Sequence, residues 1–285
     1  MLLSHNVKDL GVMVDECLTY KVHRQKSAKK VIQKLGWIRR TFSNRTIPFL
    51  KTLWTSLLQP TMDYGSVLTA PYSKVERRAA ENPLRSLTRM SPECKGLSYW
   101  ERLTKFRLYS MERRYERYKI FYIWKSLNGL VPSLGLTWDG RQGNKLTYPK
   151  VYGKPGHART LQRFSLKWEG VRIYNSLPLV IRKWTGSKES FKNLLDKFLE
   201  AIPDQPEVGH DKPGGRTLVG EPSNSIPDWI KTLGLDDLQD DLLTKSVIMS
   251  QTVPVRNGEH DDNYVSNSSI LIHMGSGHSP DHSLL

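Results

Sequence analysis

The stretch LTYKVHRQKSAKKVIQKLGWIRRTF, residues 18–42, combines apolar and basic side chains in a helical rhythm. The apolar ones recur every three to four residues, the spacing of one face of an α-helix, at Val22, Ala28, Val31, Leu35, Ile38 and Phe42. Basic side chains fill most other positions: Lys21, Arg24, Lys26, Lys29, Lys30, Lys34, Arg39 and Arg40. No acidic residue lies between Lys21 and Asn44. The pattern therefore predicts a helix with one buried face and a strongly cationic remainder.

Most of the chain outward from this stretch also has helical spacing. Helices are expected over residues 48–59, 74–90, 99–106, 108–127, 167–176 and 187–201. Pro60 is expected to end the second helix, because proline lacks the N–H that continues one. A short strand is expected around Gly11, and residues 131–165 are expected to form loops with at most short strands. The fold class is therefore mainly α, a helical bundle with a short N-terminal β element and an irregular C-terminal tail.

Charge is distributed unevenly over the 285 residues. The formal net charge is +15, but the first 200 residues hold 38 Lys and Arg against 15 Asp and Glu, whereas the last 85 hold 5 against 13. After Ile202 the chain becomes rich in Pro, Gly, Asp and Ser, a composition typical of linkers. The expected organisation is a remnant strand over 1–17, a basic helical domain over 18–130, loops and closing helices over 131–202, and an acidic tail over 203–285 with one helix at 227–243.

Composition also excludes several protein classes. No apolar stretch reaches the roughly 18 residues of a transmembrane helix. Two cysteines, Cys17 and Cys94, are too few for a disulfide scaffold or a cysteine-based zinc module. The N-terminus lacks the basic and apolar regions of a signal peptide, so an intracellular location, nuclear or cytoplasmic, is expected. The basic charge favours a polyanionic partner, above all nucleic acid.

Two clusters of basic residues are candidate nucleic-acid sites. The first is the cationic face of residues 18–42, whose side chains would follow phosphates without reading bases. The second combines Arg113, Arg114, Arg117 and Lys119 with Tyr115, Tyr118 and Tyr122, a mixture suited to holding a single strand by charge and stacking. In the alternative interpretation of the second cluster, the tyrosines belong to the core and the arginines pair with Glu112 and Glu116.

Other chemistry-bearing residues are interpreted as structural or solvated. The histidines His273, His278 and His282 lie in a Gly- and Ser-rich segment without the rigid frame that metal ligands need. The DDLQDD run at 236–241 is interpreted as the solvated face of a tail helix. His157 and Arg159, with Tyr148 or Tyr174, match only part of a tyrosine recombinase site. No catalytic residue, metal, cofactor, small-molecule ligand or membrane partner is therefore expected.

Four motifs carry a family resemblance, in order, over about residues 5–205. The first comprises Lys8, Asp9, Leu10, Gly11 and Val12, then Asp15, Leu18, Tyr20 and His23. The second comprises Leu58, Pro60, Tyr64 and Gly65, and the third Tyr99, Arg102, Leu103, Leu108, Met111, Glu112, Arg113 and Arg114. The fourth comprises Gly170, Arg172, Tyr174, Asn175, Ser176, Leu177 and Pro178, followed by Phe191, Lys192 and Leu195. Together they resemble the region after the catalytic palm in reverse transcriptases of non-LTR (LINE-type) retrotransposons of the jockey-like and CR1-like branches.

The resemblance implies a thumb and post-thumb region of an RNA-directed DNA polymerase. Such enzymes hold two Mg²⁺ ions on palm carboxylates, including an aromatic-Ala-Asp-Asp turn, and no such box occurs in this sequence. The expectation is therefore a non-catalytic fragment that binds RNA or an RNA–DNA hybrid through phosphates, with Mg²⁺ needed only in a full-length polymerase. Two alternatives stay open: part of an active polyprotein, with the palm and fingers as partners, and an inert or protein-interaction fragment.

Overall fold

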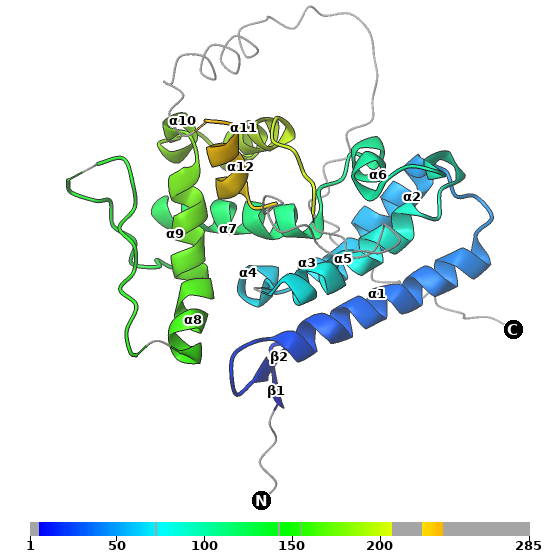
Figure 1. Cartoon of the computed structure of the whole chain (residues 1–285), viewed down its shortest axis with the longest axis horizontal. Helices are drawn as coiled ribbons and strands as arrows, with labels where there is room; N and C mark the ends of the chain where they lie inside the picture. Colours follow the sequence, from blue (N-terminus) through cyan, green and yellow to red (C-terminus); the bar gives the residue numbers. More distant parts are fainter. Residues whose placement is uncertain (1–5, 72, 142, 155, 207–223, 236–285) are drawn as a thin grey trace, which may run out of the picture.

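The computed structural model describes residues 6–71, 73–141, 143–154, 156–206 and 224–235 (Figure 1). It confirms the expected fold class. The described chain is mainly helical and begins with a small antiparallel sheet of two strands, β1 (Asn6–Asp9) and β2 (Val12–Asp15). None of the helices in these ranges has the length and apolar composition to cross a bilayer.

The N-terminal β element is a hairpin, where the sequence predicted a single strand. Asp9 pairs with Val12, which leaves Leu10 and Gly11 as a two-residue turn. Both turn residues have positive φ, 42° and 87°, as the tight turns favoured in hairpins require. Gly11 is therefore the bend that lets the chain pair with itself, and the apolar residues on either side of it belong to two strands.

Helix α1 (Lys21–Thr41) forms where the apolar and basic pattern predicted it. Val31, Leu35 and Ile38 are buried against α5 (Lys74–Thr88) and α3 (Gln59–Asp63). Helix α6 (Tyr99–Phe106), begun by a capping box at Ser98, completes this first core. Figure 1 shows α1 along the outside of the molecule, so only one of its faces is covered.

The second helical segment continues through Pro60, contrary to the prediction that it ends there. It consists of α2 (Ile47–Leu53), a π-helical turn (Trp54–Leu58) and α3. In the π turn the N–H of Gln59 bonds to the carbonyl of Trp54, five residues earlier. The wider turn makes Pro60 one of the first residues of a new α-helical segment, where its missing N–H costs no hydrogen bond. The short helix α4 (Ser66–Thr69) follows.

Helix α7 (Met111–Leu127) belongs to two cores. Met111 and Tyr115 pack in the first core, whereas Ile120, Ile123 and Trp124 pack in the second. The second core is completed by α9 (Leu166–Ser176), α10 (Leu179–Arg182) and α11 (Lys188–Glu200). The two cores therefore meet inside α7.

Between residues 131 and 156 the described residues are mostly loop, with an isolated bridge between Trp138 and Leu146. The sequence missed α8 (His157–Phe164), which packs against α9. This helix has only two turns, and it follows a Gly- and Pro-rich loop whose composition hid it. Such a short helix depends on tertiary packing more than on its own propensity.

The packed structure extends past the predicted boundary at residue 203. Helix α12 (Ile226–Thr232) places Ile226 and Ile230 in the second core, both at most 1% exposed. The carboxylate of Glu116 accepts the Ile226 N–H at 2.7 Å, and Asp204 accepts the N–H and hydroxyl of Ser110. Residues 203–206 and 224–235 are thus part of the fold, and residues 236–243 of the predicted tail helix lie outside the described residues.

Candidate nucleic-acid interface

Six of the eight basic residues predicted on α1 are exposed, among them Lys21, which also borders a pocket between α1 and α5. They are Lys21, Lys26, Lys29, Lys30, Arg39 and Arg40, named here the α1 row. Among the residues that the structure describes, no ion pair joins any of them to a carboxylate. From Lys21 to Arg40 the row rises about 28 Å along the helix axis, the length of several nucleotides.

The charges at the start of α1 do not serve the stability of the helix. Its first turn contains no acidic residue and begins with Lys21. A cation at a helix N-terminus faces the positive end of the helix dipole, which is unfavourable. Only Arg39 and Arg40, in the last turn, lie near the negative end of the helix dipole, where a cation is favourable. Helix stability alone therefore does not explain the basic face.

Arg24 and Lys34 are the two predicted residues that the fold turns inward. Arg24 donates to the carbonyls of Thr19 and Thr69 at 2.7 and 2.8 Å and pairs with Glu76 at 2.8 Å. Lys34 reaches the carbonyl of Leu57, at the end of the π turn, at 3.3 Å. Both side chains tie α1 to its neighbours. The Arg24 guanidinium is held by internal partners, which corrects its predicted role in phosphate binding, whereas Lys34 is half-buried and its role stays a prediction.

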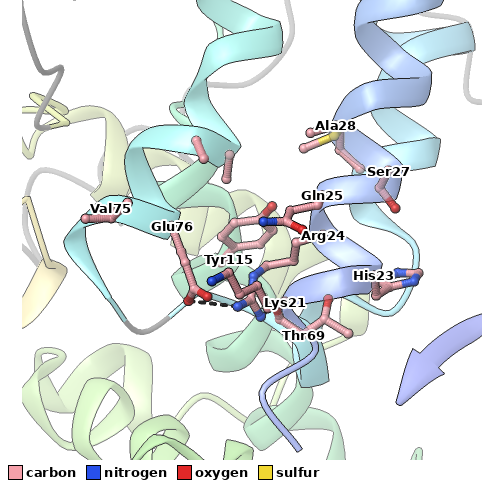
Figure 2. Close-up of a pocket in the computed structure, with 13 residues that line it drawn as sticks. Lys21, His23, Arg24, Gln25, Ser27, Ala28, Thr69, Val75, Glu76 and Tyr115 are labelled. Carbon is pink, nitrogen blue, oxygen red and sulfur yellow. Dashed lines mark hydrogen bonds and ion pairs between the residues drawn. The ribbon is translucent and has the colours of Figure 1, made fainter. Parts of the chain in front are cut away.

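A pocket of about 110 Å³ separates α1 from α5 at this point. Figure 2 shows Arg24 reaching from α1 towards Glu76 on α5, with Tyr115 of α7 lining the same space. His23 lies on another side of α1, where its ring nitrogens contact the Met13 N–H and the Tyr64 carbonyl, each at 3.4 Å. These contacts fix the rotation of α1 about its axis, and with it the outward direction of the α1 row.

The second predicted cluster, on α7, is turned into the protein. Arg113 is fully buried and donates to the Pro203 carbonyl at 2.7 Å. Arg114 pairs with Asp63 at 2.6 Å, and Arg117 holds Asp196. The predicted strand-binding role of these three arginines is therefore corrected, because their guanidinium groups are committed to internal partners.

The alternative interpretation of this cluster was right about Tyr115 and wrong about the acids, because Tyr118 and Tyr122 are only partly buried and belong to neither core. Tyr115 is buried in the first core, as that interpretation requires. Glu112, however, pairs with Arg77, and Glu116 accepts the Ile226 N–H. The acids that neutralise the arginines come from α3 and α11, far away in the sequence.

The two tyrosines of the recombinase-like set have structural contacts. Tyr174 is fully buried and its hydroxyl donates to the Arg182 carbonyl at 2.7 Å. Tyr148 is exposed and packs against Trp168, with ring centroids 5.5 Å apart. Nothing in the described ranges brings three or more His, Cys, Asp or Glu side chains together as metal ligands. The C-terminal histidines and the DDLQDD run lie outside the described residues.

A second, larger pocket of about 390 Å³ lies between α8, α9 and α12. Arg163, Arg172, Glu169 and Asp228 are among its lining residues, so both signs of charge are present. Arg172 is neutralised by Glu169 through two hydrogen bonds of 2.7 and 3.1 Å. This mixture does not favour a polyanion, so the α1 row is kept as the candidate nucleic-acid site.

The sequence missed one residue of the α1 surface, Trp37. Its side chain is 48% exposed and lies among the basic residues, although the sequence had offered no role for it. Helical spacing from Lys30 and Arg40 was the signal that could have found it. No protein family, curated protein or solved structure matches the chain.

Proposed function

We propose that α1 binds the sugar–phosphate backbone of RNA or of an RNA–DNA hybrid without reading its sequence. The α1 row carries this proposal: six exposed cations on one helix, unpaired with carboxylates in the described part of the chain. Each cation that neutralises a phosphate releases condensed counterions, which favours binding at low salt.

The character of the row favours backbone contacts over base contacts. Four of its six members are lysines, which act as point charges on flexible stems and do not make the planar paired contacts that identify a base. Phosphate contacts position a protein on nucleic acid but carry no sequence information. Sequence-independent binding is therefore the expected mode.

The resemblance to the region after the palm of LINE-type reverse transcriptases supports the same role. In such a polymerase, a basic thumb helix would hold the template and primer beside a palm supplied by another part of a polyprotein. We assign no catalytic step to the described residues. Mg²⁺-dependent polymerisation belongs, in this proposal, to the palm.

The test is an affinity measurement with the full chain and a labelled RNA–DNA hybrid between 50 and 200 mM salt. Replacing Lys29 and Lys30 by alanine should weaken binding about tenfold and reduce the slope of log affinity against log salt by about 2. The matched control is Lys188→Ala with Lys192→Ala on α11, which removes the same charge from exposed positions on the opposite side of the molecule (Figure 1). Equal losses in both variants would contradict the proposal.

A further inference from the structure

Trp37 lies on the face of α1 that carries the basic residues. Lys30, Gln33, Trp37 and Arg40 are spaced by three and four residues, which places them one above the other on the helix surface. Trp37 is 48% exposed, and Gln33 and both basic neighbours are exposed too. An ideal Cβ on Gly36 would lie 3.7 Å from Arg40 Nη1, so the Arg40 guanidinium folds back to the turn that carries the indole.

The indole is held from one side by aromatic contacts. Trp37 and Phe42 meet at 5.7 Å between ring centroids with an interplanar angle of 88°, an edge-to-face arrangement. Phe42 in turn meets Phe49 of α2 at 5.2 Å. Phe42 therefore links the indole of Trp37 to α2, and no other ring in the described residues is stacked in parallel on that indole.

An aromatic ring between cations is suited to one form of nucleic acid. Bases stack on exposed aromatic side chains whatever their sequence, and the adjacent phosphates bind to lysine and arginine. Within a duplex, base faces are covered by neighbouring base pairs, so a half-exposed indole on a helix surface cannot reach them. A single strand presents both its phosphates and its base faces.

We propose that the outer face of α1 binds single-stranded nucleic acid, with one base stacked on Trp37 and its flanking phosphates at Lys30 and Arg40. The phosphate contacts of this inference rest on the proposed function, whereas the stacking contact is additional to it. RNA and DNA strands share this chemistry.

The experiment measures the affinity of the full chain for four probes of equal length: single-stranded RNA, single-stranded DNA, a blunt hybrid duplex, and an abasic strand that keeps the phosphates. Trp37→Leu and Trp37→Ala should weaken binding to both base-containing single strands about tenfold. They should leave binding to the duplex and the abasic strand within twofold. Trp37→Phe should retain most of the single-strand affinity.

The matched control is Trp100→Ala on α6, which removes a side chain that is 40% exposed and lies outside the α1 row. This variant should leave all four affinities unchanged. Three outcomes for Trp37→Leu would overturn the stacking contact. The variant could lose affinity for every probe, lose affinity for none, or change its oligomeric state. If Lys29→Ala with Lys30→Ala weakens no probe, the proposed function fails. If that variant weakens binding and Trp37→Leu does not affect single strands, only the present inference fails.

Discussion

Arg117 on α7 holds Asp196 on α11 through two hydrogen bonds, from Nε at 2.5 Å and from Nη2 at 2.8 Å. Both side chains are largely covered, so the pair is shielded from solvent more than a surface ion pair. Arg117→Ala should lower the free energy of unfolding by about 2 kcal/mol, because it leaves a shielded carboxylate without its partner. Chemical denaturation measures this loss.

A double-mutant cycle with Asp196→Ala separates the pair from the individual side chains. The two substitutions should cost less together than the sum of their single effects. Nucleic-acid affinity should stay unchanged in all three variants. A selective loss of single-strand affinity in Arg117→Ala would restore the strand-binding role predicted from the sequence.

Ile230→Ala tests whether α12 belongs to the fold. Ile230 is 1% exposed and packs in the second core, so its truncation should cost about 2–4 kcal/mol of unfolding free energy. Thr232→Ala, at an exposed position of the same helix, is the control and should cost far less. Equal stability of both variants and the parent chain would mean that the packed body ends near residue 203.

At Gly170, helix α9 packs tightly against Ile123 of α7. A Cβ at this position would lie 2.9 Å from Cγ1 and 3.0 Å from Cδ1 of Ile123. Gly170→Ala should therefore destabilise the protein by about 1–3 kcal/mol, although alanine is the better helix former.

Ile123→Ala removes the Cγ1 and Cδ1 atoms that a Cβ at residue 170 would meet. The double variant Gly170→Ala with Ile123→Ala should therefore be more stable than the sum of the two single effects predicts. Thermal unfolding of the single and double variants measures this coupling. If Gly170→Ala raises the stability, as helix propensity alone would, then α7 and α9 are not in close contact at this position.

Glu81 makes stability depend on pH. Its carboxyl group is buried, accepts the Tyr99 hydroxyl at 2.7 Å and the Glu112 N–H at 3.0 Å, and burial raises its pKa to about 8. The unfolded chain ionises Glu81 near pH 4.5, whereas the folded chain keeps its proton up to about pH 8. The folded state therefore binds more protons in this window, and stability falls as pH rises through it, by up to about 1.4 kcal/mol per pH unit from this group.

Glu81→Gln removes this titration. Its unfolding free energy should decline less than that of the parent chain between pH 5 and pH 8, and urea denaturation at several pH values measures the difference. Glu116, whose pKa burial raises to about 7, contributes with the same sign and remains in both proteins. Parallel stability curves would show that Glu81 is ionised in the folded state.

Periodicity predicted the helices well because they bury regular apolar faces. The α1 pattern and the bounds of α6 could both be derived from local sequence. The hairpin, the passage of the chain through Pro60 and the packing of α12 could not. Each of these three features depends on a partner distant in sequence or on a backbone geometry, such as the π turn. Patterns of side-chain types do not predict either of them.

The site was predictable only in part, for the same reason. Exposure of the α1 row followed from its helical spacing. The inward turn of Arg24 and Arg117 depended on Glu76 and Asp196, acids from other helices that no local rule pairs with them. A basic residue on an amphipathic helix is therefore a candidate ligand for phosphate only once its distant neighbours are known.

The sharing of α7 between two cores has a mechanical consequence. Rotation of the first core relative to the second would have to bend a continuous helix of 17 residues or remove Tyr115 or Trp124 from its packing. The α7 helix therefore resists relative motion of the two cores. A force applied to the first core reaches α9 and α11 through this continuous helix, with no loop between the two cores along α7.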